Sequence, residues 1–149
     1  MKKFIFGLQG VLEIKEKLEG QAKVDFGIAR AALTAEEEKL EELKAKRASY
    51  LEQMRLTVEG TLKISEINRL KNAISVTDDN IRQQDMAVKR AARQLEIVRV
   101  KLNKVVQERK TIEKLREKQF EDYLKEADAE ERKETDQLIS YRYTVSDED

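Results

Sequence analysis

The sequence predicts an all-α protein built as a long antiparallel two-helix coiled coil. The chain has no proline, only one of its five glycines lies beyond residue 27, and 40% of its 149 residues are charged. Proline and glycine are the residues that most disfavour a helix interior, and a composition rich in alanine, leucine, glutamate, lysine and arginine is typical of coiled coils. Because aromatic residues make up only 5% of the chain, a thick globular core is not expected.

The first helix is expected over residues 4–58, where apolar side chains recur every seven residues. A companion series lies three residues further along, so that the two together form an a/d face able to pack against a second helix. One position of the main series is polar. The two series are Phe26, Leu33, Leu40, Arg47 and Met54, and Ala29, Leu43 and Tyr50.

The second helix is expected over residues 62–140, and its seven-residue repeat is more regular. Six aliphatic residues follow one another at this spacing without a break, and a second series again lies three residues along, which predicts one continuous packing face. The two series are Ile67, Ile74, Ile81, Val88, Leu95 and Leu102, and Leu70, Ala91, Val98, Val105 and Ile112.

The hairpin tip is expected near Gly60, because residues 57–61 contain the only glycine after residue 27 together with β-branched residues. A competing tip is the segment 75–79, whose threonine and aspartates favour the start of a helix. The unbroken repeat from Ile67 to Ile81 argues against that alternative, since a turn would shift its phase. Residues 141–149, which lose the repeat and end in acidic side chains, are expected to form a disordered tail.

Composition also excludes most catalytic chemistry. The chain contains no cysteine and no histidine, which rules out thiolate nucleophiles, zinc fingers and imidazole acid–base catalysis. No segment matches the G-x-x-x-x-G-K-[ST] pattern of a nucleotide-binding loop. The chain is therefore predicted not to be an enzyme and to carry no metal or cofactor, and no apolar run approaches the length of a membrane span.

Charge is balanced overall, with 30 basic and 30 acidic side chains, but it is distributed unevenly. Residues 82–118 hold 12 basic and 5 acidic side chains, whereas residues 119–149 hold 4 and 11. The basic segment lacks the interleaved aromatic residues of single-strand binders and any known duplex-binding module. A solvated helix face or an acidic protein partner explains it better than nucleic acid, which is not expected as a partner.

Three segments of the sequence carry recognisable motifs. The opening residues 4–16 carry Phe4-x-Phe6-x-Leu8-Gln9-x-x-Leu12 followed by Lys15-Glu16, and residues 99–118 carry Arg99-x-x-Leu102 and then the run Glu108-Arg109-Lys110-Thr111-Ile112-Glu113-Lys114-Leu115-Arg116-Glu117-Lys118. Residues 131–136 form an acidic ending. In this order the motifs, which cover residues 4–137, resemble the family of the flagellar export protein FliJ.

The resemblance implies an antiparallel hairpin similar to the central stalk of F-type rotary ATPases. It also implies three kinds of partner: a hexameric export ATPase of the FliI type, an export gate protein of the FlhA type, and export chaperones that the protein escorts. Such a protein would lie in the cytoplasm and reach the inner face of the cell membrane only through its partners.

The resemblance also suggests where these partners bind. The positions that match the family's gate-binding residues are Leu43, Tyr50, Leu70 and Ile74, and those that match the free, ATPase-side end of the hairpin are Phe4, Arg109, Lys110 and Arg116. All four gate positions also fall on the predicted seam, where they could simply be core residues. Tyr50 is the best functional candidate, because its hydroxyl requires a polar neighbour.

Two other functions remain open from the sequence. A related stalk of a virulence-type secretion system or of a rotary ATPase would share the hairpin but bind different partners. A coiled coil associated with nucleic acid through residues 82–118 would belong to another class.

Overall fold

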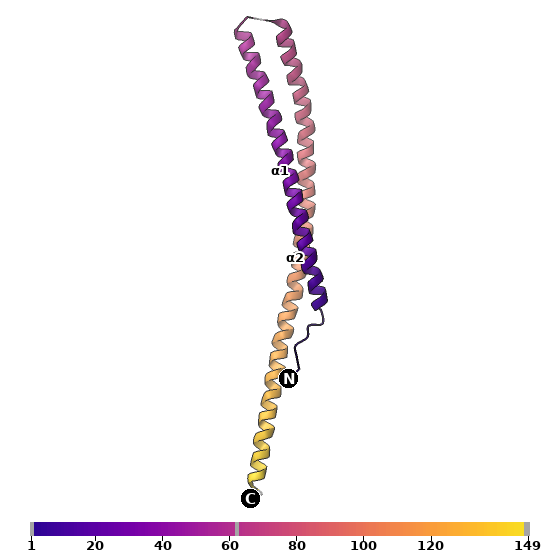
Figure 1. Cartoon of the computed structure of the whole chain (residues 1–149), viewed down its shortest axis with the longest axis vertical. Helices are drawn as coiled ribbons and strands as arrows, with labels where there is room; N and C mark the ends of the chain where they lie inside the picture. The colour runs from indigo at the N-terminus through magenta and orange to yellow at the C-terminus, as the bar shows by residue number, and fades with distance from the viewer. Residues whose placement is uncertain (1, 62, 148–149) are drawn as a thin grey trace. The chain divides into compact units, whose positions relative to one another are not determined.

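The computed structural model describes residues 2–61 and 63–147. It contains two helices, α1 (Gln9–Glu59) and α2 (Ile64–Asp147), which pack against each other in antiparallel orientation (Figure 1). The packing divides into two units. One comprises the described residues of Met1–Glu19 and Lys104–Asp149, and the other comprises those of Gly20–Asn103. The prediction of an all-α antiparallel hairpin is confirmed; the prediction that the hairpin forms a single domain stays untested.

The predicted repeats form the interface between the helices. Every residue of the four series is buried or half-buried, and Leu70 is fully buried. At seven-residue spacing, the two positions between Leu70 and Ala91 are polar, Thr77 and Gln84. Each of these side chains makes a hydrogen bond. The hydroxyl of Thr77 donates to the backbone oxygen of Ala73 at 2.8 Å, whereas the amide of Gln84 donates across the interface to the backbone oxygen of Glu36 at 2.9 Å.

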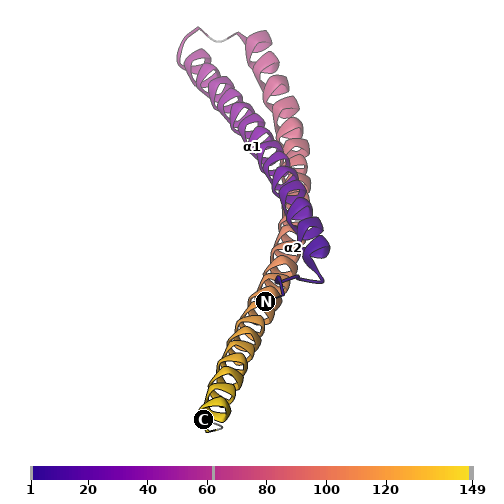
Figure 2. The ribbon, with the colours of Figure 1, turned by 60° about the horizontal axis from the view of Figure 1, so that its bottom comes forward.

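Within Gly20–Asn103, a second polar contact compensates the defect in the first repeat. Arg47 occupies a seam position, and its Nε donates to Oδ1 of Asp78 on α2 at 2.5 Å. From Glu36 to Arg47 the chain advances along α1, while the partners retreat along α2 from Gln84 to Asp78. This order is the register of an antiparallel pair, and Figures 1 and 2 show the two helices side by side in this unit.

The turn lies where the sequence predicted it. Helix α1 ends at Glu59, α2 begins at Ile64, and Gly60 donates its amide to the oxygen of Leu56 at 3.1 Å. The competing tip at residues 75–79 lies inside α2. Nothing there interrupts the helix, because Thr77 satisfies its hydroxyl on the preceding turn rather than capping a new helix.

Both outer boundaries differ from the sequence prediction. Helix α1 begins at Gln9 rather than at residue 4, and we call the non-helical residues 2–8 the N-terminal strap. Two glycines in this region, Gly7 and Gly10, weaken a helical start, and the buried side chain of Phe6 anchors the strap instead. Helix α2 continues to Asp147, so the expected disordered tail is wrong for residues 141–147. Residues 148–149 lie outside the described part of the chain.

The last part of α2 is covered by no other segment. Every described side chain over residues 128–146 is exposed, and both views show this yellow stretch extending without a neighbour (Figures 1 and 2). No proline or glycine interrupts it. Hydroxyl groups bond back to the preceding turn, as Thr144 does to the oxygen of Ser140 at 2.9 Å. The helix therefore continues beyond the packed region on its own backbone hydrogen bonds.

Candidate partner-binding site

The N-terminal strap folds back onto α2 through an aromatic cluster. The ring of Phe4 meets the ring of Phe120 edge-on, with centroids 5.2 Å apart, and lies 5.5 Å from the ring of Tyr123. Phe120 and Tyr123 are themselves 6.1 Å apart and stacked. The hydroxyl of Tyr123 donates to the backbone oxygen of Lys2 at 2.5 Å. Three rings and one hydrogen bond thus fasten an irregular segment to a helix face.

Charged groups surround this cluster. A shallow depression of about 350 Å³ lies between the strap and α2. Its lining includes the two strap lysines and two carboxylates of α2, namely Lys2, Lys3, Asp122 and Glu126. Basic side chains of the strap therefore face an acidic stretch of α2, which favours their association electrostatically.

A ladder of ion pairs joins α1 to α2 beside the strap. Lys15 Nζ lies 2.7 Å from Oε2 of Glu108, and this hydrogen bond holds the pKa of the Glu108 carboxyl below its usual range. Arg109, the residue after Glu108, bonds Glu113 at 2.8 Å and also donates to Glu19, a buried residue one turn beyond Lys15 on α1. Hydrogen bonds to Glu113 and then to Glu19 raise the pKa of the Arg109 guanidinium, so Arg109 stays charged at any working pH.

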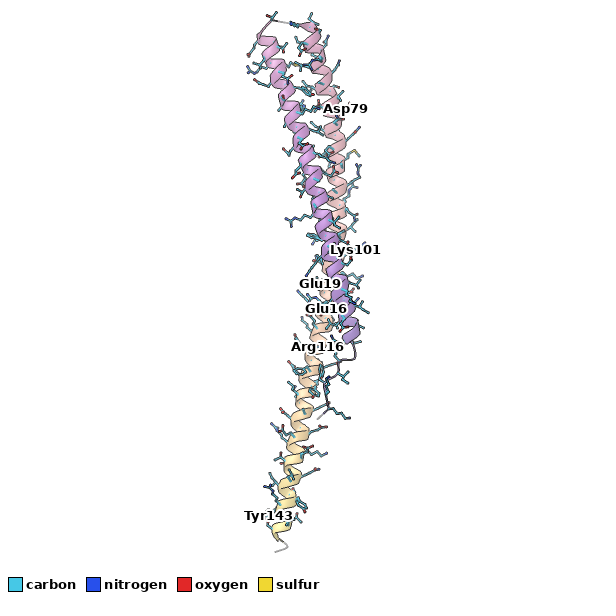
Figure 3. The ribbon with its side chains drawn as sticks, in the orientation of Figure 1. Glu16, Glu19, Asp79, Lys101, Arg116 and Tyr143 are labelled. Atoms are coloured by element: carbon cyan, nitrogen blue, oxygen red, sulfur yellow. The ribbon has the colours of Figure 1, made fainter. Side chains whose placement is uncertain are left out.

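The structure divides the four residues predicted for the ATPase side into two groups. Phe4 and Arg109 make contacts within the chain, in the aromatic cluster and in the ion-pair ladder. Lys110 and Arg116 are exposed on α2, where Figure 3 labels Arg116. All four lie in the same packing unit. Lys110 and Arg116 can reach a partner without any change in the hairpin, whereas Arg109 would have to leave Glu19.

The four residues predicted to bind the gate lie in the other unit, on the seam between the helices. Leu70 is fully buried, while Leu43, Tyr50 and Ile74 are half-buried. Lys46 lies over the ring of Tyr50 in a cation–π arrangement, with its ammonium 6.0 Å from the centroid. Leu70 is therefore a core residue in this conformation, and the other three combine packing with partial exposure.

Sequence reasoning missed the aromatic cluster and the almost buried Glu19. Phe120 and Tyr123 follow the end of the seven-residue repeat, where the packing face of α2 changes. Their spacing of three residues places them on one helix face, and this pairing with an aromatic strap is the signal that could have found them. Glu19 occupies the seam position seven residues before Phe26, but a carboxylate there gives no sign of its partner on α2.

The basic segment 82–118 is less available than its net charge suggests. Four of its cations pair with carboxylates on α2 itself: Arg82 with Asp79, Lys89 with Asp85 at 3.1 Å, Arg99 with Glu96, and Arg109 with Glu113 at 2.8 Å. Intrahelical pairs of this kind stabilise a solvated helix by a few tenths of a kcal/mol, roughly. They also neutralise part of the positive field that a nucleic acid would require.

The described residues contain neither a group of side chains placed to hold a metal ion nor a membrane-spanning helix. Across residues 2–61 and 63–147, no group of three or more acidic, histidine or cysteine side chains is placed to hold a metal ion. In the same residues, neither helix has a stretch long and apolar enough to cross a membrane.

A charged helical hairpin with polar rungs in its seam, exposed cations and a strap on one face defines the class of long coiled-coil interaction proteins. Comparison with known families makes the assignment specific. The model of the family described as "Flagellar FliJ protein" matches residues 4–148, and the chain belongs to this family. It is accordingly a non-catalytic component of a flagellar or related type III protein export system.

One solved structure provides a further comparison. The chain is similar to a Chlamydia trachomatis protein, CT670, described as a YscO homolog, with 22% sequence identity, a TM-score of 0.62 and coverage of 99% of each chain. At this level of identity the likeness shows the fold alone. No curated protein sequence matches the chain.

Proposed function

We propose that the protein is a stalk-like partner of the hexameric export ATPase, of the FliI type, that it also binds the export gate, of the FlhA type, and that it escorts export chaperones. The observation that carries the proposal is membership of the FliJ family over residues 4–148, in a chain built as an antiparallel two-helix hairpin. Such a protein works in the cytoplasm and reaches the inner face of the membrane through its partners.

The ATPase contact is assigned to the exposed cations of the unit that holds both the N-terminal strap and the end of α2. Lys110 and Arg116 are exposed. Arg109, by contrast, is half-buried, and its charge is already balanced by Glu19 and Glu113. Charged faces of a rod can meet a ring through steering and complementarity without a large apolar patch. Phe4 supports this surface indirectly by holding the strap.

Charge reversal tests the ATPase contact. The double change Lys110→Glu with Arg116→Glu is expected to weaken binding to the purified ATPase by at least tenfold while leaving helical content unchanged, since both side chains are exposed. The matched control is Lys101→Glu, an exposed lysine on the same helix but in the other packing unit. Binding that survives the double change, or that falls equally in the control, removes the assignment.

The gate contact is assigned to the half-buried seam residues Leu43, Tyr50 and Ile74, with Leu70 supporting them from the core. Tyr50 is the sharpest probe, because its ring is partly exposed and carries Lys46. We expect Tyr50→Ala to weaken binding of the purified gate domain. Tyr141→Ala, which removes a tyrosine that is 69% exposed on α2, should have no effect. Equal loss in both variants contradicts the gate assignment.

The second candidate is a related stalk in a virulence-type secretion system. The same two-helix hairpin is found in the Chlamydia YscO homolog, so the fold alone does not separate this alternative from the first proposal. The two functions differ in their partners only. Retention of a flagellar ATPase and gate from the native cytosol supports the first, whereas retention of a virulence ATPase supports the second.

A further inference from the structure

The N-terminal strap occupies a face of α2 that has the properties of a binding site. The face presents Phe120 and Tyr123, and the acidic residues Asp122 and Glu126 lie between and beside them. The strap brings Phe4 onto the two rings and two lysines into the same depression. It is therefore an extended basic and aromatic segment lying on an acidic and aromatic helix face.

The strap is held by side-chain packing, through the buried Phe6 and the ring of Phe4, rather than by helix formation. The strap is non-helical. Residue 5 of the strap is 81% exposed, and Phe120 keeps 42% of its surface exposed even with the strap in place. Among the described residues, a hydrogen bond from Tyr123 to the backbone oxygen of Lys2 joins the strap to α2. By contrast, the neighbouring α1 is fixed by two ion-pair contacts to Glu108 and Arg109, so the strap can leave while the hairpin stays closed.

We propose that the Phe120–Tyr123 face of α2 is a docking site for extended partner segments in which lysine or arginine residues adjoin aromatic residues, and that the N-terminal strap covers this site by mimicking such a segment. The partner binds in the same way as the strap. Its aromatic rings stack on Phe120 and Tyr123, and its basic side chains face Asp122 and Glu126. A partner segment can then dock only when residues 2–8 leave this face. This site is separate from the exposed cations assigned to the ATPase.

Tethering makes the strap an effective competitor. The strap runs directly into α1, and a segment tethered so closely faces its site at an effective concentration on the order of millimolar. A free peptide with the strap's own sequence must therefore compete with this local concentration in the native chain. It gains access when the aromatic anchor of the strap is removed but the face on α2 is intact.

The test uses full-length chains and a fluorescent peptide corresponding to residues 2–8, with binding followed by fluorescence anisotropy. We expect Phe4→Ala to bind the peptide about tenfold more tightly than the native chain, because loss of the Phe4 ring weakens a competitor held at an effective concentration on the order of millimolar. Ile5→Ala is the matched control, because it alters the strap at a side chain that is 81% exposed, and it should bind as weakly as the native chain. Adding Phe120→Ala to Phe4→Ala should abolish the gain.

Circular dichroism establishes that each variant keeps its helical content, so a change in binding reports the site rather than unfolding. A peptide whose Phe4 position carries alanine should not bind the Phe4→Ala chain. Equal binding by the native and Phe4→Ala chains overturns the proposal. So does binding to Phe4→Ala that persists after Phe120 is removed, or an equal gain in Ile5→Ala.

Discussion

Replacing Leu70 with alanine tests whether the hairpin depends on its seam as the packing indicates. Leu70 has no exposed surface, the most complete burial among the described hydrophobic side chains. Truncating a buried leucine to alanine costs about 2–5 kcal/mol, and the lower part of this range applies where neighbours can relax into the space. A two-helix seam is thin enough to relax, so we expect a loss of about 2–3 kcal/mol.

The assay is urea-induced unfolding followed by circular dichroism, since the helices supply the signal and the chain has no tryptophan. Val76→Ala is the control, because Val76 lies on the same helix and is 59% exposed. Its change should stay within about 0.5 kcal/mol. A free energy of unfolding for Leu70→Ala that matches either the native chain or the Val76 variant would refute the packing argument.

Three further predictions follow from the described contacts. Gly27→Ala should raise the free energy of unfolding by about 0.5–1 kcal/mol in urea titrations, because Gly27 lies inside α1 and an added Cβ meets no atom within 4 Å; an unchanged value would contradict this. In a double-mutant cycle of Arg47→Ala and Asp78→Ala, the coupling energy should be about 0.2–1 kcal/mol and should shrink in high salt, and a coupling of zero at low salt would count against the pair. The hydrogen bond from Lys15 holds the folded-state pKa of Glu108 below its usual value. The ionised carboxylate therefore stabilises the fold above the unfolded-state pKa, and this stabilisation is lost as the pH falls through the folded-state pKa. Glu108→Gln should therefore flatten that part of a pH–stability profile.

The seven-residue repeats were sufficient to predict most of the fold. An apolar residue at each seam position is a local property of the sequence, so the packing faces, the antiparallel pairing and the turn near Gly60 could be read from it. Arg47 shows where this reading stops. Its place in the repeat marked a defect, but its partner Asp78 became identifiable only with the register between the helices.

The two ends were predicted less well, for different physical reasons. At the N-terminus, the pattern of Phe4 and Phe6 is compatible with a helix, and only the position of Phe120 and Tyr123 on α2 explains an extended strap. At the C-terminus, loss of the repeat means loss of a packing partner rather than loss of helix, so α2 continues to Asp147. The binding roles of Lys110, Arg116 and Tyr50 depend on partners and stay predictions.

The most direct test of the proposed function is the rate of ATP hydrolysis by the purified export ATPase, measured with and without the protein. The account predicts no hydrolysis by the protein alone and a clear rise in ATPase turnover when it is added, because a stalk favours assembly of the ring. The Lys110→Glu, Arg116→Glu chain should produce a smaller rise. Turnover that is the same with and without the protein would contradict the proposed role.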